Sequence, residues 1–576
     1  TNHPEHHTTS PVVEEIDFGG AYDGETPFGT DPAFIDRKKI LPLLQKVDKP
    51  GRYTGGEFGV PYKDAKSARA RIVFSYPDTY ELGMSNEGLK ILYDCVQRKE
   101  DLYADRTFLP WPDFRGLMKE EGIPLYSLDQ PLEVRSFDVW AFNTAHELHY
   151  TNLLYALDLA GIPVQRKERT AADPIIITGG TAVSNPLPLF DFLDGIFMGD
   201  GEDAILEVME IVARGKEQGL SRKAILQELQ SVDGLILPEH YRATIHENGE
   251  AHYYGPMEAK RTYRAKEFAA LENVIVPSIA ITQDRVVVEV NRGCGQGCRF
   301  CHAGFWKRPV RNAEVSNLVR IAGDLLKRSG NDTITLHSLS IADYPWLEEL
   351  VVEMAQAYAP EGVSLSLPSL RVQVKTIPVL EMTSGIRKSN VTFALEAGSE
   401  LMRERIRKKS SEDNLHYLIR EIYGRGWDLV KVYFMLGLPD RDGREVDDLI
   451  KSLNALETDV FYWEKYTTKP YVDAGLIRRI DEYLTPWPCF VIAATDKILE
   501  QHSKQIDLLL DLIQKSCQQF MNDDSIIPTV SKRYDQQLQD VERWYHSTEW
   551  ATNSWVSDKM LKSVIYHLRS ANIIDL

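Results

Sequence analysis

Residues 285–302 read RVVVEVNRGCGQGCRFCH, an apolar, β-branched run followed at once by a glycine-rich turn that carries three cysteines. The run from Arg285 to Val290 predicts a strand. Glycine adopts positive φ at little cost, so the turn can fold tightly around an inorganic core. Cys294, Cys298 and Cys301 would supply three thiolates to a four-iron, four-sulfur cluster, which leaves one iron without a protein ligand. An open metal position is what a catalytic site keeps and a structural site closes.

Two other interpretations of these cysteines stay open: a zinc site completed by His302, or three unrelated thiols. Adjacent Cys301 and His302 would be awkward tetrahedral partners, and structural zinc sites usually draw on two separated ligand pairs. The remaining cysteines are isolated and are predicted to be small apolar core side chains: Cys95, Cys489 and Cys517. This distribution is not that of a secreted disulfide framework.

Downstream of the cysteines, apolar runs alternate with helical patterns. The stripe of apolar residues over 315–326 predicts a helix, and the residues over 347–358 repeat that pattern. Strands are expected at Arg285–Val290, Thr333–His337, Val363–Pro368, Val391–Leu395 and Leu429–Met435. This alternation predicts an open or partial barrel of parallel strands, whose chemistry would lie at the strand C-terminal ends.

Upstream, a first alternating set predicts a doubly wound parallel sheet. Its strands are expected at Arg71–Phe74, Pro124–Ser127, Asp138–Phe142, Pro174–Thr178 and Gly195–Met198. The predicted organisation is an N-terminal extension over 1–60 with a helix near residues 35–47, the sheet domain over 61–237, a connecting region over 238–280, the partial barrel over 281–457 and a further piece over 458–576.

The spacing CxxxCxxC, with aromatic Phe300 before the last cysteine, resembles the motif of the radical S-adenosylmethionine superfamily. Residues 49–57 (KPGRYTGGE) and 77–86 (PDTYELGMSN) are similar to a subfamily that pairs a cobalamin-binding-like domain with the radical domain, and the resemblance covers residues 35–457. It implies that the three cysteines hold the cluster, that the open iron chelates S-adenosylmethionine and that Phe300 lies near the adenine. The implied reaction is reductive cleavage to a 5′-deoxyadenosyl radical, followed by hydrogen abstraction from an unidentified substrate.

The same resemblance implies further cofactor contacts at strand ends. Glu396 and Ser399 match a family segment that contacts the ribose and carboxylate, with ordinary strand-end capping as the alternative. Ser338 and Ser340 follow the second strand, where the family binds the cofactor amine, although the usual Gly-Gly-Glu is absent. Arg371 would pair with the carboxylate or stay solvated. Gly437 belongs to a turn similar to one near the adenine.

Cobalamin domains of the related fold carry an Asp-x-His-x-x-Gly loop whose histidine ligates cobalt. Here the loop after the first expected strand is PDTYELG at residues 77–83 and contains no histidine. Glycine turns at 178–180 and 198–202 are expected at strand C-terminal ends, where ligands enter such sheets. Either the domain binds cobalamin without a protein histidine, or it keeps the fold and binds nothing.

The sequence changes character near Glu457. Residues 459–470 and 485–490 resemble the second half of a periplasmic solute-binding protein of the thiamine-precursor-binder type. A strand at Cys489–Ala493 and a long helix from Asp496 to about Phe520 are expected there. The junction indicates a fusion or a misassembled reading frame, and an aromatic helical tail is the alternative. A barrel that stops here would lack its last strand and expose an unpaired edge.

Composition limits the partners. The formal net charge of −19 leaves nucleic-acid binding unsupported, since that attraction depends on Lys and Arg. No apolar run is long enough to span a bilayer, and the first residues lack the features of a signal peptide. No membrane association and a cytoplasmic location are therefore expected, although the chain begins without Met and a longer precursor is an alternative.

The predicted fold class is α/β: a doubly wound parallel sheet, a partial radical S-adenosylmethionine barrel and a C-terminal α/β, mostly helical fragment. The predicted cofactors are a 4Fe–4S cluster and S-adenosylmethionine. The predicted partners are the substrate and an electron donor such as flavodoxin or ferredoxin. The competing hypothesis is a non-catalytic metal- or ligand-binding protein, inactive because its barrel is truncated.

Overall fold

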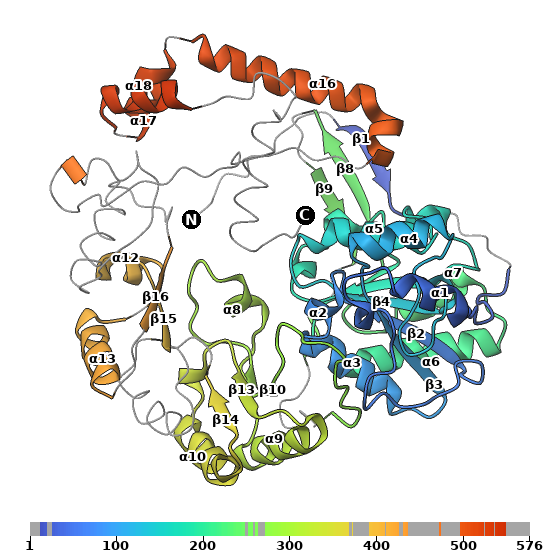
Figure 1. Cartoon of the computed structure of the whole chain (residues 1–576). Coiled ribbons are helices and arrows are strands. Elements are labelled where there is room, and N and C mark those ends of the chain that lie inside the picture. The colour runs from blue at the N-terminus through green and yellow to red at the C-terminus, as the bar shows by residue number, and fades with distance from the viewer. Residues whose placement is uncertain are drawn as a thin grey trace, which may run out of the picture. The chain divides into compact units, whose positions relative to one another are not determined.

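The computed structural model describes residues 12–19, 26–247, 251–256, 260–262, 271–367, 371, 391–408, 410–425, 430–435, 472–473, 496–523, 525–534 and 536–548 (Figure 1). The chain divides into two compact units. The first consists of residues 1–396 and 403–433, and the second of residues 397–402 and 434–576. No helix among the described residues is long and apolar enough to cross a membrane.

The largest sheet of the first unit has the strand order β3-β2-β4-β5-β6-β7. All neighbouring pairs are parallel except β6 and β7. In chain order the five parallel strands therefore run 2-1-3-4-5, which is the flavodoxin-like doubly wound arrangement. The strands are β2 (Ala70–Ser75), β3 (Leu102–Thr107), β4 (Val139–Asn143), β5 (Ile175–Gly179), β6 (Gly195–Phe197) and β7 (Leu235–Ile236).

Both faces of this sheet are buried, as expected for parallel strands covered by helices. Alternate residues of one strand enter different cores: Ile72 belongs to one and Val73 to the other. One core contains side chains of α3 (Glu87–Gln97), α6 (Glu202–Glu217) and α7 (Arg222–Leu229), and the opposite core contains those of α5 (His149–Leu159). The predicted doubly wound parallel sheet is thereby confirmed.

One strand prediction for this sheet was wrong, and two of its strands, β3 and the short β7, were not predicted. Strand β3 was missed because it contains Asp105 and Arg106, two charged residues that are typical of exposed segments. In the structure both side chains are fully buried. Arg106 is neutralised by ion pairs with Glu57 and Asp129, which lie far away in the sequence. Residues 124–127 were expected to form a strand, but they form a loop in which Tyr126 makes only an isolated bridge.

A second parallel sheet has the order β10-β13-β14, with strands β10 (Val286–Glu289), β13 (Thr333–His337) and β14 (Ser364–Ser366). Helices α9 (Val315–Ser329) and α10 (Leu347–Tyr358) form its crossovers, as their apolar spacing predicts (Figure 1). Val286, Val288 and Ile334 are buried, whereas Val287 and Glu289 are only partly buried on the opposite face.

The next two strands, β15 (Val391–Glu396) and β16 (Val430–Phe434), form a separate two-stranded sheet. Helix α12 (Glu400–Arg405) follows β15, and helix α13 (Glu412–Gly424) precedes β16. All five strands predicted for this region are therefore present, but the described residues divide them between two sheets and form no closed barrel.

The predicted N-terminal extension contains structured elements. Strand β1 (Val12–Asp17) pairs antiparallel with β8 (Arg242–His246), which pairs with β9 (Ala251–Tyr254). Helix α1 (Arg37–Leu44) shares a small core with α4 (Pro112–Glu120). The division of the chain into five segments stays a prediction.

In the second unit the structure describes three further helices: α16 (Asp496–Met521), α17 (Ile526–Tyr534) and α18 (Leu538–Ser547). Helix α16 matches the long helix expected from the sequence. The hydroxyl of Tyr545 donates to the carbonyl oxygen of Phe520 at 2.7 Å. The strand expected at residues 489–493 lies outside the described residues.

Candidate functional site

The cysteine loop, residues 293–301, begins directly after the short strand β11 (Asn291–Arg292). Its tight path requires glycine. Gly293 has φ of 88°, and a β-carbon there would lie 2.5 Å from the carbonyl oxygen of Pro309. Gly297 has φ of 68°. The loop is thus held close to the backbone of the segment that follows helix α8 (His302–Trp306).

The three thiols of this loop are free of disulfides. Cys298 is buried, and Cys294 and Cys301 are half-buried. The sulfur of Cys301 accepts a hydrogen bond from the backbone N–H of Gly304 at 3.3 Å, at the start of α8. Three reduced thiols on one glycine loop are a donor set that suits an iron–sulfur cluster.

No set of three or more His, Cys, Asp or Glu side chains in the described ranges is grouped as ligands of a metal ion. The thiols therefore share a loop without forming such a group. Arg371 lies with Nη1 at 3.8 Å from Cys298 Sγ. A guanidinium group therefore lies next to one of the three sulfurs.

Polar side chains fasten the cysteine loop to the turn after β13. Gln296 Nε2 donates to Asp343 Oδ2 at 2.8 Å, and the hydroxyl of Ser340 donates to the same oxygen at 2.5 Å. The hydroxyl of Ser338 donates to Asn291 Oδ1 at 2.7 Å. The hydroxyls of Ser338 and Ser340 therefore bind protein atoms next to the cysteine loop, and their contact with the cofactor amine stays a prediction.

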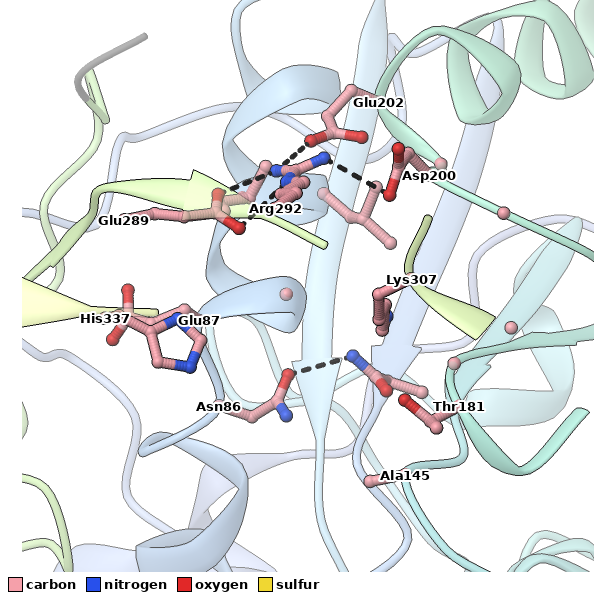
Figure 2. A pocket seen from close by; sticks show the side chains of 18 of the residues that line it. Asn86, Glu87, Ala145, Thr181, Asp200, Glu202, Glu289, Arg292, Lys307 and His337 are labelled. Carbon is pink, nitrogen blue, oxygen red and sulfur yellow. Dashed lines mark hydrogen bonds and ion pairs between the residues drawn. The ribbon is translucent and has the colours of Figure 1, made fainter. Parts of the chain in front are cut away.

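A cluster of charges, which we call the Arg292 cluster, joins the cysteine loop to the first sheet. It consists of Arg292, Glu289, Glu202, Asp200 and Arg311. Arg292 lies 2.5 Å from Glu202, 2.8 Å from Glu289 and 3.5 Å from Asp200 (Figure 2). Arg311 also pairs with Asp200. Burial alone would lower the pKa of Arg292, but the carboxylates of Glu289 and Glu202 raise it above its usual value. The guanidinium thus stays charged and bridges the two sheets.

A cavity of about 830 Å³ lies within the first unit, beside this cluster. Ligand pockets of small molecules commonly measure 300–1,000 Å³. One wall is the partly buried face of β10 and β13, with Val287, Glu289, Thr335 and His337. The other wall comes from α3, α6 and the glycine turns that follow β5 and β6, at 179–181 and 199–202. The cavity therefore opens at the C-terminal edge of the first sheet, the edge expected to receive ligands.

Glu396 at the end of β15 and Ser399 just after it make different contacts. Glu396 has φ of 71°, and its carboxylate pairs with Lys408 at 3.1 Å. The hydroxyl of Ser399 accepts from the backbone N–H of Met402 at 3.2 Å, which is helix capping. Phe300 is half-buried. Gly437 lies outside the described residues.

The loop after β2 carries no histidine, and its Asp78 bonds the neighbouring N–H of Thr79 at 2.7 Å. Two histidines follow β4 instead. His149 is fully buried, and its ring lies 3.8 Å from the exposed His146 ring. Burial, together with His146, lowers the pKa of His149 to about 4. Neither histidine lies in the loop after β2, where cobalamin domains of the related fold carry their cobalt ligand.

Sequence reasoning missed Gln296, Asp343, Arg292 and Lys307. Arg292 could have been identified from the sequence, because it lies between the predicted strand and the first cysteine. Gln296 lies inside the loop, but nothing in the sequence indicates its distant partner. Asp343 and Lys307 carry no recognisable motif, and only the folded chain brings them to the site.

Two family models match the chain. The model of radical SAM proteins, N-terminal, matches residues 88–238, and the model of the radical SAM superfamily matches residues 288–453. An uncharacterised protein of Methanocaldococcus jannaschii is 23% identical over 393 residues, which cover 68% of this chain and 74% of that protein.

Solved structures are also similar. The radical S-adenosylmethionine methyltransferase TsrM from Kitasatospora setae, solved with tryptophan and an S-adenosylmethionine analogue, has a TM-score of 0.49 and 13% identity, over 68% of this chain and 72% of that one. The cobalamin-dependent S-adenosylmethionine radical enzyme OxsB, solved with aqua-cobalamin, has a TM-score of 0.46 and 14% identity, over 67% of this chain and 52% of that one.

Proposed function

The chain belongs to the radical S-adenosylmethionine superfamily, and on this premise we propose that it cleaves S-adenosylmethionine reductively at a 4Fe–4S cluster held by Cys294, Cys298 and Cys301. The observation that carries the proposal is the glycine loop with three reduced thiols directly after β10 and β11. When bound, the cluster would supply the single electron that reductive cleavage of the sulfur–C5′ bond of S-adenosylmethionine requires.

The chain's own residues hold and shield this site. Gln296 and Asp343 fix the loop at the turn after β13, and the backbone N–H of Arg299 donates to Ile406 at 2.9 Å on another side. Arg371 places a positive charge beside Cys298. A loop fixed at several points keeps its thiols in a geometry that need not reorganise when ligand binds.

We propose that S-adenosylmethionine lies against this loop. Glu396 and Ser338 would bind its polar groups, with Ser340, Ser399 and Arg371 as further contacts and Phe300 and Gly437 near the adenine. Glu396 lies at the end of β15, and Ser338 directly follows β13. Both assignments are supported by the rule that parallel-strand barrels carry their catalytic residues at the C-terminal ends of the strands. The hydroxyl of Ser399 already caps α12, so its contribution is the weakest of the set.

The substrate and the reductant are assigned by class only. Hydrogen abstraction requires a substrate with an accessible C–H bond, and cleavage requires an electron donor such as flavodoxin or ferredoxin. Because the loop after β2 offers no histidine, the residues present do not match the usual cobalamin motif, and no step is assigned to cobalamin. A cytoplasmic location and the origin of residues 458–576 stay predictions.

Anaerobic reconstitution of the full chain with iron and sulfide tests the proposal. We expect a brown protein that, with dithionite and S-adenosylmethionine, releases 5′-deoxyadenosine. The variant Cys298→Ala should lose both properties. A colourless protein without 5′-deoxyadenosine, or one that binds zinc in metal analysis and leaves S-adenosylmethionine intact, would support the non-catalytic alternative.

A further inference from the structure

The cavity beside the Arg292 cluster is lined by four carboxylates and three cations, and two of these cations have no ion-pair partner among the described residues. Each of its four lining carboxylates has a cation within ion-pair distance: Glu87 has Lys90, Glu202 and Glu289 have Arg292, and Asp200 has Arg292 and Arg311. Two lining cations, Lys307 and Arg285, make no ion pair with any residue that the structure describes.

Lys307 follows α8, and its backbone N–H closes that helix on Ala303 at 3.0 Å. Its side chain lies at the cavity, between Asp200 and the Asn86 side of the wall (Figure 2). The nearest charges are the carboxylates of Asp200 and Glu289 and the guanidinium groups of Arg292 and Arg311. Burial lowers the pKa of Lys307, because its ammonium group is largely removed from water. Lys307 is half-buried, and the two carboxylates near it already pair with Arg292 and Arg311, so a bound anion would stabilise its ammonium group.

Other features of the same wall favour negative charge. Arg285 donates to the neutral side-chain oxygen of Gln283, which leaves its charge uncompensated. Helix α6 begins after Gly201 without a side-chain cap, so its first N–H groups lie at the cavity, while Glu202 and Asp203 in its first turn offset its positive dipole end. Thr335 Oγ1, also at the wall, is buried and finds no hydrogen-bond partner in the described part of the chain.

We infer that this cavity binds a ligand other than S-adenosylmethionine, whose carboxylate or phosphate group is held by Lys307 Nζ. The inference rests on the proposed function to the extent that this ligand is the substrate of the radical reaction. Arg285 adds a second cation without an ion-pair partner to the same cavity, and Thr335 adds a neutral polar contact.

Chemical labelling of the reconstituted full chain tests the site without any turnover. Acetic anhydride labels unprotonated lysine amines, and peptide mass spectrometry reads Lys307 separately from the exposed Lys119, which serves as the control. Inorganic pyrophosphate and succinate supply the two anionic groups, and sodium chloride matches their ionic strength. We expect at least one of them to slow labelling of Lys307 several-fold in a saturable way, with labelling of Lys119 unchanged.

Equal labelling of Lys307 in both anions and in sodium chloride would overturn the inference. So would protection by S-adenosylmethionine alone, because the cavity would then belong to that molecule. A second measurement uses thermal unfolding: the protective anion should raise the midpoint of wild type and Lys307→Arg, but not of Lys307→Met. Failure of 5′-deoxyadenosine release with intact protection would count against the proposed function only.

Discussion

Gln296 in the cysteine loop and Asp343 after β13 share a 2.8 Å hydrogen bond, so the loop is tied to the neighbouring strand by a side-chain amide. Asp343 also accepts from Ser340. One carboxylate therefore sets the position of the loop relative to the strand end where the cofactor is proposed to bind. This relationship gives the loop a support that is separate from its thiols.

We predict that Gln296→Leu weakens this support without unfolding the chain. Loss of one hydrogen bond to a carboxylate should cost about 1.5–3 kcal/mol, which corresponds at most to roughly a 10- to 150-fold drop in kcat/KM for 5′-deoxyadenosine release. Iron content should stay near that of wild type, which separates loss of loop position from loss of the cluster. Gln296→Glu serves as a charge-repulsion comparison and should be worse. Unchanged kinetics in both variants would show that the bond has no role.

Removal of a single thiol should abolish cluster binding. Cys294→Ala, Cys298→Ala and Cys301→Ala are each expected to show near-background iron, sulfide and visible absorbance after reconstitution, because the three thiolates act as one ligand set. Cys517→Ala, in α16, is the matched control and should reconstitute like wild type. Full cluster content in any one of the three loop variants would remove that cysteine from the ligand set.

Arg292→Met should destabilise the first unit. It leaves Glu202 and Glu289 largely buried beside an apolar side chain, and breaking a buried ion pair in this way costs about 3–5 kcal/mol. Urea unfolding measures the change. Arg320→Met, on an exposed pair with Asp324, should change the free energy of unfolding by less than about 1 kcal/mol. Recovery of part of the loss in the double variant Arg292→Met/Glu202→Gln would identify the unpaired carboxylate as the cause.

The left-handed backbone at Glu396 predicts that two variants of this residue differ in stability but not in binding of S-adenosylmethionine. At φ of 71° a β-carbon is strained, so Glu396→Gly should be more stable than Glu396→Ala by about 1 kcal/mol. Both variants lose the proposed contact with S-adenosylmethionine and should bind it equally weakly. Urea unfolding and equilibrium binding measure the two effects. Wild-type affinity in both would reject Glu396 as a cofactor contact.

Stability should fall on acidification because of His149. Its folded-state pKa of about 4 lies below the usual 6.5, so the unfolded chain binds more protons between these values. The contribution is complete above pH 6.5 and is lost progressively as the pH falls toward 4. His149→Gln should flatten this part of the stability curve, measured as urea midpoints between pH 7.5 and 4.5. His146→Gln, on the exposed ring, should leave most of the slope in place.

Periodicity predicted those elements whose burial follows a simple pattern. Strand β13 was expected at Thr333–His337 and occurs there, and α9 and α10 follow their apolar stripes. Strand β3 could not be found in this way, because Asp105 and Arg106 look like surface residues until Glu57 and Asp129 are brought against them. A buried ion pair between distant segments leaves no local signal in the sequence.

The residues of the candidate site also differ in whether a local sequence pattern reveals them. The cysteines and the glycines between them form one short motif, so they are visible in the sequence. Asp343 and Lys307 are single charged residues outside any motif, and their roles depend on contacts across the fold. Ser399 shows the converse: a motif resemblance selected it, and its hydroxyl caps a helix.

The antiparallel pairing of β1 with β8 also affects synthesis of the chain. Asp17 pairs with Arg242, so about 225 further residues must be synthesised before the partner of β1 leaves the ribosome. At the usual 5–20 residues per second this takes roughly 10–45 s. During that interval its edge is available to other nascent or unfolded chains. Co-expression with a chaperone that binds extended segments should therefore improve the yield of native protein.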